Sequence, residues 1–515
     1  MKLLGKVGVV SAMTGVSRVF GLVREVAMAH FFGTSTLQSA FVIAFRVPNL
    51  FRRLFGEGAL GAAFIPIFTE IERAEGRERA QLFASRILGL LICALGLLVG
   101  VGIAATFGVE RLCGEASRWT EAMPLMRIML PYALLICVAA ILSAMLQVHE
   151  RFAIPALTPV VLNVVWIAAL VGLCPFLPAE GYWRIGAVSW GILLAGLAQV
   201  LFQLPELRRV GYVLRPTLRG WRASPYVRRV LLQMGPASLG IALAQINICL
   251  DGWLAFYGAS WAPSALEYAD RIIYLPLGLF GTAFATVLLP TYSRQFADGA
   301  PTLAGETLCQ ALRNLLFLMA PMTLGLMLLA EPTVALIYQR GAFTAQSTLW
   351  TARAILAYAP GLLIFSANKV IVPLFYAQKD LRTPVKVASW CILANVTCNI
   401  LSVFLLPEGW RHAGIAASTV LSSLLNTLIL LHLLRRRDFR PDFAPLLREA
   451  QRVAVAVGAM AALLLAAGCL LPAWPLLLRL PLLIALGAAT YGLACLALLP
   501  QTARAVLKRL ARRRH

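Results

Sequence analysis

Blocks of about twenty apolar residues recur along this chain, and they constrain its fold more than any other feature. One block covers 86–107 and another covers 477–499. A helix of that length crosses a hydrocarbon core of about 30 Å. Hydrophobic residues make up 60% of the chain and charged residues only 13%, too little polar surface for a soluble protein of this length. The sequence therefore predicts an all-α integral membrane protein.

The apolar blocks divide the chain into about fourteen predicted transmembrane helices. Their ranges are 7–31, 38–68, 86–107, 122–147, 154–176, 184–205, 230–257, 264–290, 311–337, 349–377, 385–406, 412–434, 452–472 and 477–499.

The net charge of +23, from 46 Lys and Arg against 23 Asp and Glu, follows this topology. With a cytoplasmic amino terminus, the cytoplasmic loops carry about thirty Lys and Arg and the opposite loops about five, as the positive-inside rule requires. We therefore predict a multi-pass protein with both termini cytoplasmic, and no nucleic-acid partner. The 10 cysteines form no CxxC motif, which favours neither a zinc site nor a disulfide framework.

Two halves of the chain share a pattern. Ser39-Ala40 precedes Arg46 in the second predicted helix, and Ser264-Ala265 precedes Arg271 in the eighth at the same spacing. Six helices also return the chain to its starting side, so the seventh begins with the orientation of the first. The pattern predicts two six-helix lobes with a parallel, pseudo-twofold repeat and a transport path between them, plus two C-terminal helices.

The predicted organisation has six parts. They are an N-lobe at 1–205, a cytoplasmic interfacial linker at 206–229, a C-lobe at 230–434, a cytoplasmic loop at 435–451, the last two helices at 452–499 and a basic cytoplasmic tail at 500–515.

Arginines deep in the predicted helices are the most informative residues. Arg18 and Arg24 lie in the middle of the first helix, where a charge costs at least about 2.5 kcal/mol and usually faces a watery cavity. Arg52 and Arg53 in the second helix and Arg271 in the eighth extend the cluster toward the lobe interface. Because guanidinium groups bind phosphate oxygens bidentately, the cluster predicts an anionic, phosphorylated amphiphile as cargo.

The alternative is that each arginine pairs with a nearby acid. The candidate pairs are Arg24 with Glu25, Arg53 with Glu57, and Arg271 with Asp270 or Glu267. Sequence neighbours do not face each other on a helix, which weakens the first pair.

Asp251 is a carboxylate inside the seventh predicted helix. Such an acid often marks an ion or proton site, and Asn395, Thr397 and Asn399 of the eleventh helix could complete a sodium shell. A buried acid paired with an arginine is the other interpretation.

Three stretches resemble the MurJ (MviN) lipid II flippase family. They are SAMTGVSRVFGLVRE at 11–25, FRVPNLFRRLFGEGA at 45–59, and YADR at 268–271 followed by PLG at 276–278. The resemblance implies the fold of the multidrug/oligosaccharidyl-lipid/polysaccharide exporter superfamily, alternating access and a central cationic cavity. It also implies a bacterial inner-membrane location, with lipid II and the bilayer as partners and cell-wall synthesis proteins as further candidates.

The resemblance also implies residue roles. Arg18, Arg24, Arg52 and Arg271 would be cavity cations that bind lipid II, with Asn49 and Glu57 as supporting groups and Glu25 where many members have Asp. Arg53 and Asp270 complete the expected substrate-binding set. Asp251 matches a sodium ligand of some members, and the last two helices would line a groove for the polyprenyl tail. Gln38-Ser39 stand where members commonly carry an acid, which puts any role of that acid in doubt here.

We therefore predict a transporter and not an enzyme: a lipid II flippase without a cofactor, coupled to Na+ or to the membrane potential. The alternatives are an exporter of another polyprenyl-diphosphate oligosaccharide and a drug/cation antiporter of the same superfamily, which would need more intramembrane acids than this chain has. A membrane glycosyl- or phosphotransferase would need clustered acids or histidines, and the 5 histidines are scattered. A non-transporting scaffold protein would not explain why the chain retains arginines that are costly to place inside the membrane.

Overall fold

The structure is a computed structural model of the chain, and it describes residues 2–56, 59–114, 117–179, 181–435, 442–471 and 474–499. All of the regular elements in these ranges are helical. The chain forms two compact units: unit 1 lies within Met1–Ser264 and Arg340–Phe343, and unit 2 lies within Ala265–Gln339 and Thr344–His515.

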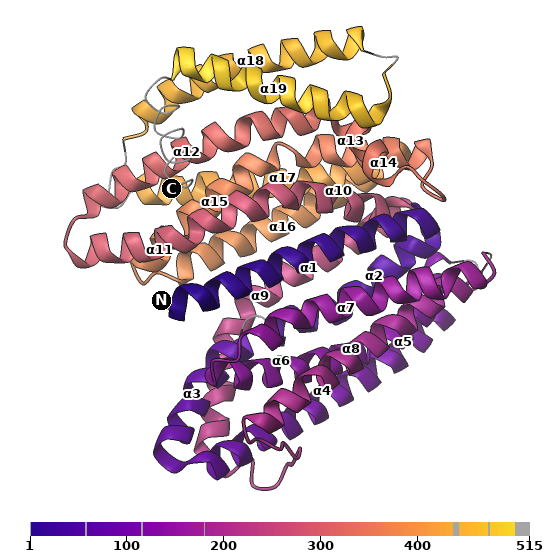
Figure 1. Cartoon of the computed structure of the whole chain (residues 1–515), viewed down its shortest axis with the longest axis vertical. Coiled ribbons are helices and arrows are strands. Elements are labelled where there is room, and N and C mark those ends of the chain that lie inside the picture. The colour runs from indigo at the N-terminus through magenta and orange to yellow at the C-terminus, as the bar shows by residue number, and fades with distance from the viewer. Residues whose placement is uncertain are drawn as a thin grey trace. The chain divides into compact units, whose positions relative to one another are not determined.

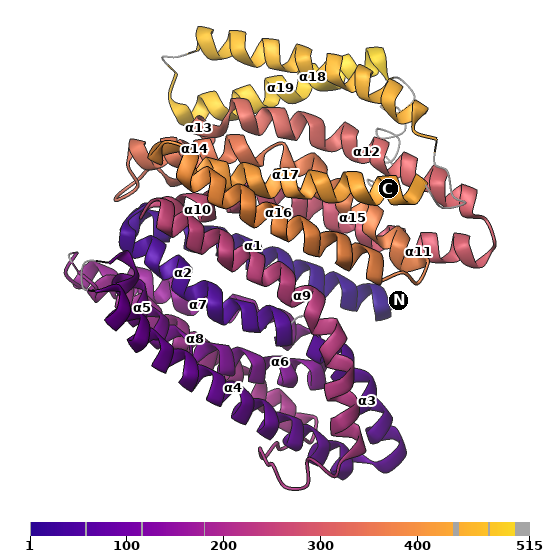
Figure 2. The same cartoon turned by 180° about the vertical axis from the view of Figure 1, so that it is seen from behind.

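Unit 1 is a bundle in which α1 packs along α7, α7 packs on α8, α8 packs on α6, and α2 packs on α5 (Figures 1 and 2). Its core is rich in aromatic rings; Phe64 stacks on Phe68 and Phe83, and Phe41 and Phe45 meet Trp166 edge-on. The elements are α1 (Lys2–Phe32), α2 (Thr36–Phe51), η1 (Arg52–Gly56), α3 (Ala59–Glu75), α4 (Arg77–Cys113), α5 (Arg118–Met129), α6 (Tyr132–Val148), α7 (Ala153–Gly172), η2 (Cys174–Phe176), α8 (Trp183–Arg209) and α9 (Pro225–Gly258).

Unit 2 repeats much of this packing, with α16 on α17, α15 on α17 and α11 on α15, and its last two helices form a hairpin against α12. Its elements are α10 (Ala262–Pro276), η3 (Leu277–Gly281), α11 (Thr282–Ala297), α12 (Pro301–Leu328), α13 (Ala330–Tyr338), α14 (Ala345–Tyr358), α15 (Gly361–Ala377), α16 (Arg382–Leu405), α17 (Glu408–Arg435), α18 (Ala444–Leu470) and α19 (Leu476–Leu498).

The second and eighth predicted helices are each interrupted by a π-helix, η1 and η3, where the sequence predicted continuous helices over 38–68 and 264–290. Proline explains the position of both breaks, because it lacks the N–H that an α-helix needs and clashes with the preceding turn. Pro48 lies four residues before η1, and Pro276 immediately precedes η3. The same α–π–α order in both halves agrees with the internal repeat.

Helix α9 belongs to unit 1, where it packs on α2 and α3. The sequence repeat counts it as the first helix of the C-lobe. The repeat and the compact units therefore divide the chain at different places.

Each of the fourteen predicted segments coincides with one helix or with consecutive helices. Nine helices of the described part are long and apolar enough to cross a membrane, and a tenth span results if the pair α14 and α15, bent by 42°, counts as one. The larger count stays a prediction.

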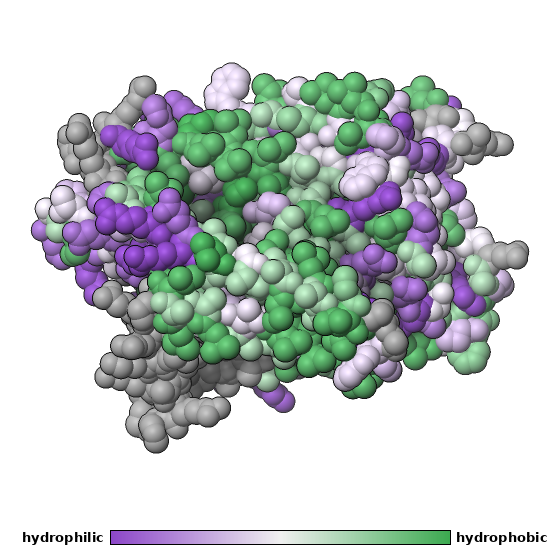
Figure 3. Space-filling model, turned by 90° about the horizontal axis from the view of Figure 1, so that it is seen from above, coloured by the Kyte–Doolittle hydropathy of each residue, from purple (hydrophilic) through white to green (hydrophobic). Residues whose placement is uncertain are grey.

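Apolar side chains cover the outer face of α18 and α19. Figure 3 looks down on this hairpin and shows hydrophobic residues across its middle, with polar residues toward the two ends. Val455, Leu465, Leu477 and Leu493 are each more than half exposed on it. A surface of this kind is suited to lipid and not to water.

The connection between α8 and α9, residues 210–224, is fastened to the ends of α3 and α4, and we call it the strap. Thr217 N donates to Ser85 O at 3.1 Å, and Arg86 Nε donates to Arg219 O at 3.0 Å. Tyr212 is fully buried and donates its hydroxyl to Glu72, whose Oε1 also lies 2.8 Å from His149 Nε2. Burial alone would raise the pKa of Glu72, but the hydrogen bonds from Tyr212 and His149 hold that pKa below its ordinary value.

Candidate functional site

Arg18 and Arg24 of α1 have opposite environments. Arg18 is exposed and makes no hydrogen bond or ion pair with any residue that the structure describes. Arg24 is 7% exposed, and both of its terminal guanidinium nitrogens have polar partners. The sequence grouped these two arginines together, but of the two only Arg18 is exposed to a ligand from outside the protein.

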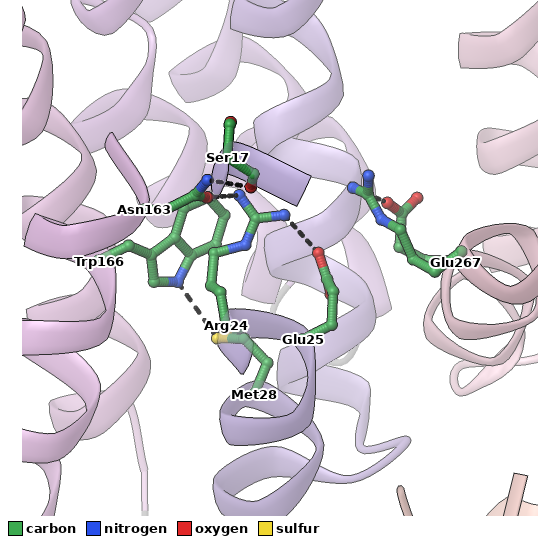
Figure 4. Close-up of polar contacts among 8 residues, drawn as sticks. Ser17, Arg24, Glu25, Met28, Asn163, Trp166 and Glu267 are labelled. Carbon is green, nitrogen blue, oxygen red and sulfur yellow. Dashed lines mark hydrogen bonds and ion pairs between the residues drawn. The ribbon is translucent and has the colours of Figure 1, made fainter. Parts of the chain in front are cut away.

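Arg24 is held by α1 and α7 together (Figure 4). Its Nη1 donates to Asn163 Oδ1 at 3.0 Å, its Nη2 pairs with Glu25, and its guanidinium carbon lies 4.2 Å from the centre of a Trp166 ring. Trp166 in turn directs its indole N–H at Met28 Sδ, 3.3 Å away. The pairing of Arg24 with Glu25, which the helix geometry made less expected, is present.

Arg46 and Arg53 connect α2 and η1 to α9. Arg46 Nη1 donates to Ile248 O at 2.8 Å, and Arg53 Nη1 donates to Gln245 Oε1 at 3.2 Å. Gly252 makes the first contact feasible, because a Cβ at that position would collide with the Arg46 guanidinium.

Arg52 begins the π-helix η1, and its Nε donates to Asn49 Oδ1 at 2.8 Å. Asn49 therefore contacts Arg52 directly, and its role as a supporting group of the substrate site stays a prediction. Glu57, the predicted partner of Arg53, lies outside the described residues.

Arg271 pairs with Glu267 one turn earlier on α10, at 2.7 Å between Nη2 and Oε1. This confirms one of the two pairings weighed from the sequence. The Arg271 side chain stays 45% exposed in this pairing. Asp270 is half-buried on the same helix.

Asp251 lies on α9 beside Asn247, whose Nδ2 is 3.5 Å from Asp251 Oδ2. The other amide atom, Asn247 Oδ1, is buried and has no hydrogen-bond partner among the described residues. Carboxylate and amide oxygens are ligands of hard cations, and a sodium site at Asp251 stays a prediction. In unit 2, Asn399 Nδ2 donates to Asn395 Oδ1 at 3.1 Å, and Thr397 Oγ1 donates to the backbone of its own helix.

Ser39 occupies the position where an acid was expected and bonds to its counterpart in the repeat. Ser264 N donates to Ser39 Oγ at 3.3 Å, and the two hydroxyls are 3.0 Å apart. Both side chains are fully buried, and Gln38 is 2% exposed. A neutral hydroxyl is therefore sufficient to contact the start of α10 in this chain.

Unit 1 brings together Arg24 with Glu25 and Arg52 with Asn49, and it places Arg46 and Arg53 along α9. Arg271 and Asp270 lie in unit 2, so a chamber shared by all of these arginines stays a prediction. The sequence did not single out Asn163 or Trp166. Their spacing of three residues on a strongly apolar helix is typical of a stripe that faces lipid or the protein core. The polar side chain of Asn163 was the one sequence signal that could have identified this pair as functional.

Comparisons with known proteins agree with this architecture. The family model described as Lipid II flippase MurJ matches residues 28–482. The chain is 35% identical over 435 residues to a Burkholderia cenocepacia protein named lipid II flippase MurJ, covering 83% of each chain. It is 34% identical over 434 residues to a Vibrio cholerae protein named probable lipid II flippase MurJ, covering 82% of this chain and 81% of that one.

Among solved structures, the fold is similar to that of lipid II flippase MurJ in an inward closed conformation. The TM-score is 0.77 at 23% identity, over 95% of this chain and 98% of that one. An inward-facing multidrug resistance transporter of the MATE family, in the MOP superfamily, has a TM-score of 0.66 at 16% identity, over 83% and 97% of the two chains. From the extent of the family match and the identity to these relatives, the chain belongs to the MurJ lipid II flippase family.

Proposed function

We propose that this protein translocates lipid II, the undecaprenyl-diphosphate-linked peptidoglycan precursor, from the cytoplasmic to the periplasmic leaflet by alternating access. The observation that carries the proposal is the family match over 28–482, together with relatives of the same name at 34–35% identity over most of the chain. The proposal places the protein in the bacterial inner membrane with both termini cytoplasmic.

The charges on the membrane helices support an anionic cargo. Arg18 is exposed in the middle of α1, and the Arg271 side chain is 45% exposed beside Glu267. A diphosphate offers oxygens that such forks bind bidentately, and a drug cation would be repelled by them. Asn49 would hold Arg52 ready in the same way.

The position of Asp251 within α9 makes sodium the candidate coupling ion. Asp251 and Asn247 Oδ1 would contribute oxygen ligands to the ion. Binding of the ion would then favour one conformation of α9 over another.

Replacement of Arg18 or Arg271 by alanine tests the function. Each variant should bind lipid II roughly 10- to 100-fold more weakly, because a hydrogen bond to a charged group contributes about 1.5–3 kcal/mol. The measurements are growth of a flippase-depleted strain and periplasmic exposure of lipid II, with protein level and membrane insertion checked.

The matched control is Arg209→Ala, which removes a surface arginine that is 76% exposed and paired with Glu206 at 3.1 Å. It should support normal growth. Full growth on Arg18→Ala would contradict the proposal, and export of a different polyprenyl-diphosphate saccharide, with no lipid II exposed, would identify the alternative exporter.

A further inference from the structure

One face of α1 is built to fit α7. Ser17, Gly21, Arg24 and Met28 follow one another at spacings of four, three and four, which places them on one stripe of a helix. Helix α7 packs along this stripe. A Cβ on Gly21 would lie 4.0 Å from Asn163 Nδ2, an ordinary van der Waals distance, so Gly21 faces this amide.

Asn163 binds α1 at two points. Its Oδ1 accepts from Arg24 Nη1 at 3.0 Å, and its Nδ2 donates to the backbone carbonyl of Ser17 at 3.2 Å. Ser17 and Arg24 are seven residues apart in α1, and the long Arg24 side chain reaches back toward Ser17, so one amide contacts both. With 6% of its surface exposed, Asn163 is enclosed between the helices and both ends of its amide are engaged.

Trp166 gives the same helix face a flat support. The Arg24 guanidinium lies over its ring, and the indole N–H contacts Met28 one turn further along α1. Trp166 is 3% exposed, and Glu25, which neutralises the guanidinium, is 6% exposed. Three residues of α1, spread over about three turns, are therefore attached to two side chains of α7 (Figure 4).

These contacts determine the direction of Arg18. Arg18 follows Ser17 directly, and successive side chains on a helix differ in direction by about 100°. When the Ser17 carbonyl and Arg24 are held against α7, Arg18 lies to one side of that face, about 90° round the helix from it, in agreement with its exposure.

We propose that Asn163 and Trp166 are positioning residues for transport: they hold Arg24 and the Ser17 carbonyl, fix the rotation of α1 about its axis and so keep Arg18 directed at the cargo. This inference rests on the proposed function for the identity of the cargo. If Asn163 and Trp166 served only helix packing, replacing them would affect lipid II binding independently of Arg18. If they position Arg18, their replacement should weaken binding only when Arg18 is present.

A double-mutant cycle separates the two roles. Asn163→Leu removes both hydrogen bonds of the amide and should raise the Kd for lipid II about tenfold, and combining it with Arg18→Ala should weaken binding no further than Arg18→Ala alone. Trp166→Phe, which keeps a ring and loses the indole N–H, is a milder second variant and should follow the same pattern. The control is Thr158→Val, a buried change on the same helix that loses only a hydrogen bond to Ile154 O; it should leave the Kd unchanged.

A second readout does not depend on lipid II. Arg18→Cys, in a chain whose 10 native cysteines are replaced, should react readily with a water-soluble thiol reagent. Adding Asn163→Leu or Trp166→Phe should slow that reaction severalfold, and adding Thr158→Val should not change it.

The outcomes are distinct. Independent, multiplying effects of Asn163→Leu and Arg18→Ala on binding, or unchanged reactivity of the thiol introduced at position 18, would overturn the positioning role. If wild-type protein binds no lipid II while the reactivity of that thiol falls in both α7 variants, the proposed function is wrong and the positioning of residue 18 stands.

Discussion

Arg24 and Glu25 show how side-chain length decides an ion pair inside a helix bundle. Adjacent residues leave a helix in directions about 100° apart, which made their pairing less expected from the sequence. Both side chains are long and flexible, however, and α7 blocks other directions with Asn163 and Trp166. Burial of a lone guanidinium would be costly, so the adjacent carboxylate becomes its partner.

Asp251 provides a test of ion coupling at the level of one residue. Replacing sodium by choline should lower transport by the wild-type protein on the order of tenfold, equivalent to about 1.4 kcal/mol of coupling between ion and cargo. Asp251→Asn should remove this dependence, because the amide offers the ion one oxygen and no charge. The measurement is lipid II translocation in vesicles with and without sodium.

Asn247→Leu, which deletes the neighbouring amide oxygen, should weaken the sodium dependence in the same direction. A wild-type rate that is equal in sodium and choline would exclude sodium as the coupling ion.

Two kinds of element differ from the prediction: helices that are interrupted, at η1 and η3, and a helix that packs in the other unit, α9. A hydropathy block cannot reveal a π-helix, because one inserted residue barely changes local apolarity; the prolines Pro48 and Pro276 were the only sequence signal of η1 and η3. The assignment of α9 to unit 1 depends on particular contacts such as Arg46 with Ile248 O and Arg118 with Phe256 O. Neither contact follows from helix periodicity.

The strap tests how an irregular segment is held on a helix. At Gly89 of α4, a Cβ would lie 2.5–2.7 Å from backbone atoms of Thr217. Gly89→Ala should therefore displace the strap at a cost of about 1–3 kcal/mol, the usual range for overpacking. Hydrogen exchange should rise in residues 213–219.

Gly108→Ala on the same helix is the control, since a Cβ there meets nothing within 4 Å. It should leave exchange in the strap unchanged and stabilise α4 by up to about 1 kcal/mol through helix propensity. Equal exchange in both variants would show that the strap is not held at Gly89.

At the scale of the whole molecule, orientation in the membrane follows from the distribution of charge. A green fluorescent reporter fused after residue 515 should fluoresce, and a phosphatase that is active only in the periplasm should be inactive there, because both termini are predicted to be cytoplasmic. The same phosphatase fused after a truncation at Leu177, in a predicted periplasmic loop, should be active. Phosphatase activity at residue 515 would reverse the assigned topology.

Apolar blocks, loop charges and three motifs, two of them long, were enough to identify an all-helical membrane protein of this family, because membrane insertion is governed by local hydropathy and charge that any stretch carries by itself. The surroundings of each arginine were decided by tertiary structure. Arg18 and Arg24 look equivalent in the sequence, yet only Arg24 meets Asn163 and Trp166, which are about 140 residues away along the chain. Which face of α1 packs on α7 depends on shape and hydrogen-bond fit between distant segments, and no local pattern encodes that fit.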